Sequence, residues 1–159
     1  MADTWKYMKA SDGISGKEGT LYATIDGKVV PVAECKSINA KITKNKTEFK
    51  ALGYRGTQQK ATGWTGTGTL TIHYATSRWA KMMVDYAKKG IDTYFKLQIT
   101  NEDPTSSIGK QTVTLIDVNL DEAEVAKLDT DAEFLDEQMN FTFSDIEMPD
   151  EFAEINTIQ

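Results

Sequence analysis

Between residues 65 and 74 the chain reads TGTGTLTIHY, in which short polar residues alternate with glycine and apolar residues. Successive side chains of a β-strand point to opposite faces of a sheet. One face of this strand therefore carries threonine at almost every position, and the other carries two glycines followed by leucine, isoleucine and tyrosine. The alternation predicts a strand with one buried face and one hydrated face.

Two other segments, residues 37–43 and 135–144, alternate in the same way. The short polar positions of the three strands are Ser37, Asn39, Lys41 and Thr43, then Thr65, Thr67, Thr69 and Thr71, then Gln138, Asn140, Thr142 and Ser144. An ordinary solvent-exposed face would carry more lysine and glutamate, so these short side chains favour a surface that lines a confined aqueous space. An ordinary hydrated sheet face fits the pattern equally well.

The rest of the chain predicts a mainly β fold. Further strands are expected at residues 21–25, 28–43, 94–100, 112–120 and 132–146. One helix is predicted over about residues 77–89, where the helical repeat places Trp79, Met82, Met83 and Tyr86 on one side. We therefore expect an antiparallel β-barrel or sandwich with one flanking α-helix.

The 159 residues are expected to form a single domain with three distinct segments. Residues 1–13 lack periodicity and predict an N-terminal arm, and residues 148–159 predict an acidic C-terminal tail. Residues 44–64 hold several glycines and most of the basic charge, and predict a long loop. Structureless loops of this length are uncommon inside a compact domain and usually have a function.

Charge is distributed unevenly along the chain. Residues 36–60 contain seven basic residues and one acid, a net charge of +6, whereas residues 117–154 contain fourteen acids and one lysine, a net charge of −13. Opposite charges on different surfaces of one protein can attract each other across copies, and such head-to-tail contacts build rings or filaments. Two hydrated surfaces that never meet are the alternative.

The composition argues against catalysis and against a bound metal. The chain has one histidine, His73, and one cysteine, Cys35, which excludes an internal disulfide and fits a reducing compartment. Zinc sites need several His or Cys ligands at close spacing. We expect no catalytic residue, no cofactor and no metal. No apolar run approaches the roughly 18 residues that span a bilayer, so no stable membrane association is expected.

Several short segments resemble a known family in their order and spacing. They are ISGKEG at 14–19, KNKTE at 44–48, TGWTGTGT at 62–69, DYAKKG at 85–90, YF at 94–95, VTLIDVN at 113–119 and FTF at 141–143. Together they make the chain similar, over about residues 12–150, to the tail tube proteins of PBSX-like prophages, contractile-tailed phages and R-type bacteriocins of the clostridial type.

The resemblance implies a structural protein rather than an enzyme. It implies hexameric rings that stack into the hollow inner tube of a contractile tail. Such a tube serves either as a conduit for DNA and a tape-measure protein or as a tube that punctures a membrane. The implied partners are further copies of the chain, a sheath protein, a tape-measure protein, a baseplate hub and a tail terminator, with DNA passing only in an infectious phage. The implied location is the cytoplasm of the bacterial host during assembly, then a virion tail or a released particle.

Specific residues receive roles in this interpretation. Residues of the 44–64 segment are expected to reach a neighbouring subunit, namely Lys44, Lys46, Lys50 and Arg55. The channel is expected to be lined by Ser37, Asn39, Thr67, Thr69 and Thr71. A monomeric β-barrel that uses basic residues 44–60 to bind an anionic ligand or nucleic acid is the alternative, and a hydrolase centred on His73 is a weaker one.

Overall fold

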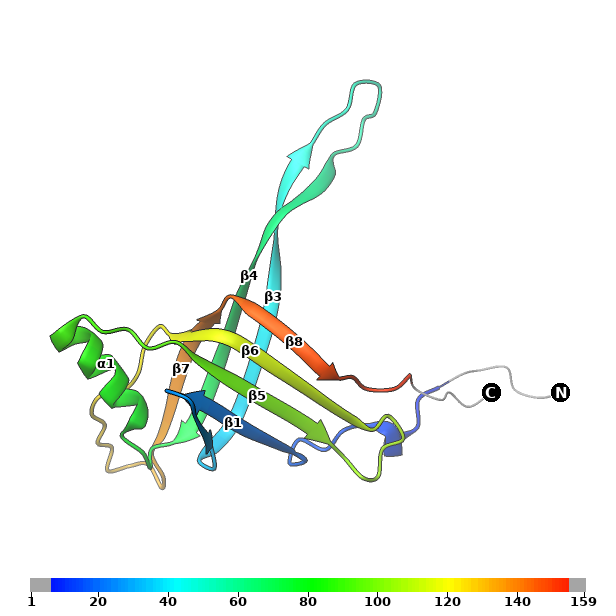
Figure 1. Ribbon diagram of the computed structural model, residues 1–159. Helices are drawn as coiled ribbons and strands as arrows, with labels where there is room; N and C mark the ends of the chain where they lie inside the picture. Colours follow the sequence, from blue (N-terminus) through cyan, green and yellow to red (C-terminus); the bar gives the residue numbers. More distant parts are fainter. Residues whose placement is uncertain (1–6, 155–159) are drawn as a thin grey trace. The chain divides into compact units, whose positions relative to one another are not determined.

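The computed structural model describes residues 7–154, and these form antiparallel strands with one α-helix (Figure 1). The strands are β1 (Gly19–Ile25), β2 (Lys28–Pro31), β3 (Cys35–Phe49), β4 (Gln58–His73), β5 (Phe95–Glu102), β6 (Lys110–Leu120), β7 (Asp136–Phe143) and β8 (Asp145–Asp150); the helices are α1 (Arg78–Lys89) and a short 3-10 turn, η1 (Ala10–Asp12). The predicted class, mainly β with one helix, is confirmed. The chain divides into two compact units, of which the first contains residues up to 33, residues 95–116 and residues from 146 onward.

The first unit is built on strands β2, β1, β5 and β6, in that order, with β8 paired to β6. The β1–β2 hairpin turns at Asp26 and Gly27, whose φ angles of 51° and 78° match the tight turn that the sequence predicts. Leu21, Ala23 and Leu97 are buried in this unit. Alternate residues of β1 and β5 therefore supply its core.

Two buried aspartates tie the N-terminal segment to the β5–β6 loop. Asp12 accepts hydrogen bonds from the Ser107 hydroxyl (2.7 Å) and backbone N–H (3.1 Å), and Asp103 accepts one from the Ser15 N–H (3.0 Å). These bonds hold the pKa of both carboxyls below the usual value of 3.8. The predicted arm at 1–13 is therefore wrong for residues 10–13, which are bound in place; residues 1–6 lie outside the described part.

The C-terminal segment contacts the same loop. The Ala153 N–H donates to the Ile108 carbonyl at 2.7 Å, and Lys110 lies 3.7 Å from Asp150. The predicted tail at 148–159 is wrong for its first residues, because β8 runs through Pro149 to Asp150. Proline is tolerated on a strand where no partner needs its missing N–H. Residues 155–159 lie outside the described part.

The second unit contains residues 34–94 and 117–145 and is built on β3, β4 and β7. One face of these strands is apolar, and Leu70, Ile72 and Met139 on it are fully buried. Helix α1 confirms the predicted helix; it ends at Lys89 and is capped by Gly90, which has the left-handed conformation. Its apolar stripe is narrower than predicted, because Trp79 is fully buried whereas Tyr86 is 55% exposed.

Glycines and aromatic rings meet on the apolar face of this sheet. In the pairing of β4 with β7, Gly66 lies opposite Phe143 and Gly68 lies opposite Phe141. A Cβ atom at Gly68 would lie 2.3 Å from Phe141 Cζ and 2.6 Å from the Asn39 carbonyl oxygen. The rings therefore occupy the space of the missing side chains, and no larger residue fits at these positions without displacing them.

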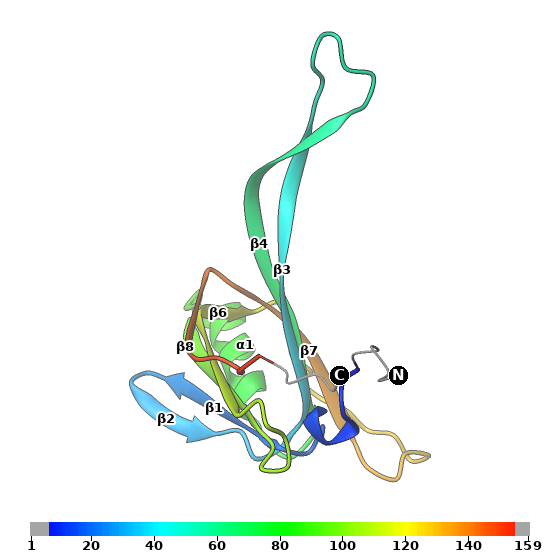
Figure 2. The same ribbon diagram turned by 90° about the vertical axis from the view of Figure 1, so that its right-hand side faces the viewer.

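The predicted loop at residues 44–64 is wrong. Strands β3 and β4 continue through most of it as a two-stranded ribbon that extends beyond β7, and only residues 50–57 connect them (Figure 2). Asn45 pairs with Gly63 and Lys46 with Ala61, which leaves Thr62 as an extra residue in β4. Such a β-bulge shifts the alternation of side chains by one position. The period-2 pattern therefore shifts at Thr62, while the two strands are paired on both sides of it.

We expect Gly68→Ala to lower the free energy of unfolding by about 1–3 kcal/mol, because the new methyl group overpacks the contact with Phe141. Gly63→Ala is the matched control on the same strand, since the nearest atom to its Cβ is Asn45 Nδ2 at 3.9 Å. Urea unfolding of both variants measures the difference. If Gly68→Ala and Gly63→Ala are equally stable, the Phe141 ring does not require a glycine at position 68.

Candidate assembly interface

The three polar strand faces that the sequence predicts lie side by side in the second unit. The cross-strand rows are Ser37, Thr71 and Gln138; Asn39, Thr69 and Asn140; and Lys41, Thr67 and Thr142. The Thr69 hydroxyl donates to Asn140 Oδ1 at 3.0 Å. The structure thus brings together all five residues expected to line a channel, on the face opposite the glycine–phenylalanine pairs.

This polar face carries short hydroxyl and amide groups and very little charge. Ser37 and Asn39 are exposed, and Thr67, Thr69 and Thr71 are half-buried beneath their neighbours. Lys41 is the one cation in the three rows. Among the described residues no group of His, Cys, Asp and Glu could hold a metal ion. The hydroxyl and amide groups of the face can stay hydrated.

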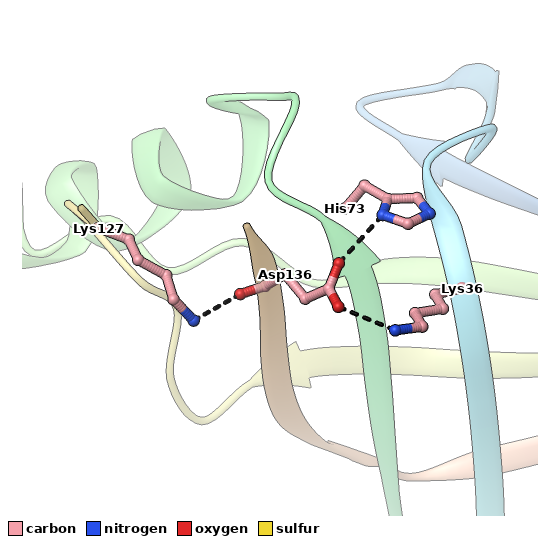
Figure 3. Close-up of polar contacts among 4 residues, drawn as sticks. All are labelled: Lys36, His73, Lys127 and Asp136. Carbon is pink, nitrogen blue, oxygen red and sulfur yellow. Dashed lines mark hydrogen bonds and ion pairs between the residues drawn. The ribbon is translucent and has the colours of Figure 1, made fainter. Parts of the chain in front are cut away.

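A cluster of charged side chains around Asp136 lies at one end of this face (Figure 3). His73 and Asp136 are direct cross-strand partners, with Nδ1 and Oδ1 3.0 Å apart. Lys36, the extra residue of a bulge in β3, donates from Nζ to Asp136 Oδ2 at 2.9 Å. The Lys36 hydrogen bond holds the pKa of Asp136 below its usual value of 3.8. The residue pattern does not reveal this cluster, because a bulge in β3 is needed to bring Lys36 to Asp136.

The ribbon carries the four cations predicted to contact a neighbouring subunit. Lys44, Lys46, Lys50 and Arg55 are all exposed, and within residues 7–154 none of them makes an ion pair with an acid. The ribbon also exposes large apolar side chains that the sequence does not predict to be exposed: Ile42, Phe49, Leu52, Tyr54 and Trp64. Two strands alone are marginally stable in water, and a cluster of exposed apolar residues marks an interaction surface.

Trp64 anchors the base of the ribbon. Its ring centroid lies 6.4 Å from that of Phe143, at an interplanar angle of 46°. This is a favourable separation for a tilted aromatic pair. Beyond Gly66, which pairs with Phe143 at the end of β7, no third strand among residues 7–154 pairs with the ribbon. It is therefore fixed to the sheet at its base only.

An acidic connector lies at the other end of the same sheet. Residues 121–135 lead into β7 at Asp136, whereas the ribbon begins beyond the far end of β7 at Phe143. The cations of the ribbon and the acids of the connector therefore lie toward opposite ends of the β3–β4–β7 sheet, whereas Lys36 of the basic segment is bonded to Asp136 at the connector end. Three large apolar residues of the connector are exposed: Val125, Leu128 and Phe134.

Known proteins show the same sequence pattern over almost the whole chain. A family model described as "Phage tail tube protein" matches residues 6–150. The chain belongs to the phage tail tube protein family. This tail tube protein is 44% identical over 147 residues to the Phage-like element PBSX protein XkdM of Bacillus subtilis, covering 92% of this chain and 97% of XkdM. It is 45% identical over 144 residues to the uncharacterized protein YqbM of the same strain, covering 91% and 95%.

Solved structures share the fold of this tail tube protein. A chain of the anti-feeding prophage baseplate matches with a TM-score of 0.65 at 11% identity, over 86% of this chain and 95% of that one. The SPP1 tail tube matches with a TM-score of 0.61 at 11% identity, over 91% and 81%. The expected tail-tube fold is thus confirmed, while similarity at this identity concerns the fold alone.

The described part of this tail tube protein has no helix that is long and apolar enough to cross a membrane.

The Asp136 cluster predicts a pH dependence of stability. Because the pKa of Asp136 is lower in the folded than in the unfolded protein, its contribution is present above pH 3.8 and is lost as the pH falls through the folded pKa. We expect Asp136→Asn to be less stable than the wild type near neutral pH, with a difference that shrinks below pH 3.8. Chemical unfolding at several pH values measures this difference. Asp131→Asn, in the exposed connector, is the control, and a gap for Asp136→Asn that does not depend on pH would contradict the prediction.

Proposed function

We propose that copies of this chain form hexameric rings that stack into the hollow inner tube of a contractile phage tail or phage-tail-like bacteriocin. The observation that carries the proposal is the single sheet with a short polar face and oppositely charged ends. A symmetric oligomer can use both features at once. It places the polar face around a channel and brings the oppositely charged ends into head-to-tail contact. The similar baseplate of the anti-feeding prophage is sixfold symmetrised, which supports the ring size.

The free edge of β3 supports lateral contact within a ring. Within the described residues, β3 has 15 residues and pairs only with β4. A long unpaired edge is a template for another strand, and closing strands into a barrel removes such edges. Pairing between copies would extend the polar face around a channel lined by Ser37, Asn39, Thr67, Thr69 and Thr71.

The short polar lining suits a conduit. A channel for DNA or a tape-measure protein must be hydrated but must not retain its cargo. A dense basic lining would hold DNA through counterion release. The threonine, serine and asparagine side chains of the face carry no charge, and Lys41 is its one cation.

The ribbon supports axial contact between rings. Its cations Lys44, Lys46, Lys50 and Arg55 would meet acids of residues 121–137 on another copy, because these surfaces lie at opposite ends of one sheet. Exposed ion pairs are worth only about 0–1 kcal/mol each, yet a ring would repeat each of them sixfold.

The proposed partners follow from this place in the particle. Similar chains occur in a sheath–tube complex and beside a sheath/tube terminator of an extracellular contractile injection system, which supports a sheath and a terminator as partners here. We include a baseplate hub and a tape-measure protein, with passage of DNA in an infectious phage. Assembly would take place in the host cytoplasm before the chain enters a virion tail or a released particle.

Negative-stain electron microscopy of the purified protein, alone and with its baseplate hub, tests the proposal. Sixfold rings or hollow tubes are expected. A protein that stays monomeric under all these conditions and binds DNA with a steep salt dependence would instead support the monomeric binding module.

Charge reversal on the ribbon should block stacking. We expect Lys46→Glu with Lys50→Glu to shorten or abolish tubes while the subunit stays folded, because both side chains are exposed. Lys17→Glu with Lys28→Glu changes the net charge equally at exposed positions of the first unit and should leave tubes intact. Tube length is measured by microscopy and folding by circular dichroism. Wild-type tube growth by the ribbon variant would refute the axial role of these lysines.

Thiol labelling tests the channel lining. In a Cys35→Ser background, cysteine is placed at Asn39 or Thr71, and assembled tubes are treated with a small or a bulky maleimide. We expect the small reagent to react and the bulky one to be excluded, because access is through the tube ends. Unassembled subunits serve as the reference for each reagent. If intact tubes react equally with both reagents, this face lies on the outside.

A further inference from the structure

Glu137 is a buried carboxyl group on the apolar face of β7. It is 1% exposed and lies opposite Ile72, while the neighbouring residues on its face, such as Met139, are also buried. Burying a carboxylate in apolar surroundings is costly unless hydrogen bonds compensate. Burial raises the pKa of Glu137. An apolar residue would suit the core better, so the carboxyl group requires another explanation.

The Glu137 carboxylate holds the acidic connector in shape. Its Oε1 accepts a hydrogen bond from the Glu124 backbone N–H at 2.9 Å. On one side of this contact the Asp121 N–H donates to the Asn140 carbonyl at 2.8 Å, and on the other Lys127 Nζ donates to the Asp136 carbonyl at 2.6 Å (Figure 3). Residues 121–127 are therefore tied to β7 at three successive points, of which Glu137 is the middle one.

The connector held in this way presents an apolar and acidic surface. Val125, Leu128 and Phe134 are 61%, 90% and 81% exposed. Asp129, Asp131 and Glu133 are interspersed with them in the sequence. Exposed apolar residues that gather in one short segment indicate a surface that binds a partner.

The ribbon has the complementary composition. Phe49, Leu52 and Tyr54 are 55%, 106% and 61% exposed, and cations surround them in the sequence. The connector and the ribbon lie at opposite ends of the β3–β4–β7 sheet. A ribbon therefore meets a connector most simply when the two belong to different copies.

We propose that residues 121–135 form the docking surface for the ribbon tip of a second copy, and that Glu137 is the positioning residue that keeps this surface ordered. Leu128 and Phe134 contact the apolar side chains of the ribbon tip and supply affinity, while the opposite charges set the orientation. The inference rests on the proposed head-to-tail stacking and names the surfaces that make it.

Crosslinking between two single-cysteine proteins tests the contact. One carries Leu52→Cys and the other Leu128→Cys, both in a Cys35→Ser background, and the mixture is oxidised at concentrations that favour assembly. We expect the mixed disulfide dimer to exceed the homodimers in mass spectra. Val29→Cys, 65% exposed on β2, replaces Leu128→Cys in the control mixture.

Glu137 variants test the positioning role. Glu137→Leu removes the acceptor and suits the apolar face, so it should fold, yet lower the rate of the Leu52–Leu128 crosslink about tenfold, equivalent to about 1.4 kcal/mol. Glu137→Gln keeps an oxygen acceptor and should restore the rate. Trypsin should cut after Lys127 faster in the leucine variant, which reports the order of the connector independently of assembly. An unchanged crosslink rate in folded Glu137→Leu would overturn the positioning role. If Glu137→Leu does not fold, the crosslink rate of Glu137→Gln is compared with that of the wild type, and a lower rate for Glu137→Gln would overturn the role of Glu137 as an oxygen acceptor.

The outcomes separate this inference from the proposed function. Tubes without the Leu52–Leu128 crosslink would overturn the docking surface and leave the tube proposal standing. The crosslink without rings or tubes would support the docking surface and overturn the hexameric tube. Phe134→Ser, at an exposed residue, should weaken the crosslink without lowering stability, whereas Val29→Ser should change neither; equal crosslinking by both would contradict the docking role of Phe134.

Discussion

The close approach of Phe141 and Phe143 to Gly68 and Gly66 is the constraint on which the second unit depends. Each ring lies where a cross-strand side chain would otherwise stand, so the apolar face of β4 is completed by β7 rather than by its own residues. The arrangement fixes the register, because a slip of one residue would turn every side chain of β7 to the other face. The polar rows on the opposite face are aligned by the same register.

The two ends of this sheet then acquire different characters. Where β7 ends, β3 and β4 continue as a ribbon whose cations and apolar side chains are exposed. Where β7 begins, Asp136 bonds to Lys36, His73 and Lys127, and the acidic connector leads into the strand. A subunit with unlike ends can join further copies end to end, which is the geometry that the proposed tube requires.

Most of the fold could be predicted because its signals are local. The period-2 alternation of β4 and the glycine at the end of α1 each depend on a few neighbouring residues. What could not be predicted depends on partners far along the chain. The bulge at Thr62 hides the continuation of β4, and Asp12 becomes a fixed point only when Ser107 is brought to it. Glu137 lies at a core position of β7, and its partner, the Glu124 N–H, is a backbone group that no residue pattern reveals.

The attachment of residues 12 and 153 to one loop has a consequence for engineering. Residues 12 and 153 bind the β5–β6 loop at Ser107 and Ile108, which are adjacent in the sequence. Segments that lie close together in a fold can be joined by a short peptide, and the chain can then be opened elsewhere. The 50–57 turn, remote in sequence from that loop, is one place to open it. A circularly permuted subunit would show whether the sheet forms without an unbroken backbone between β3 and β4.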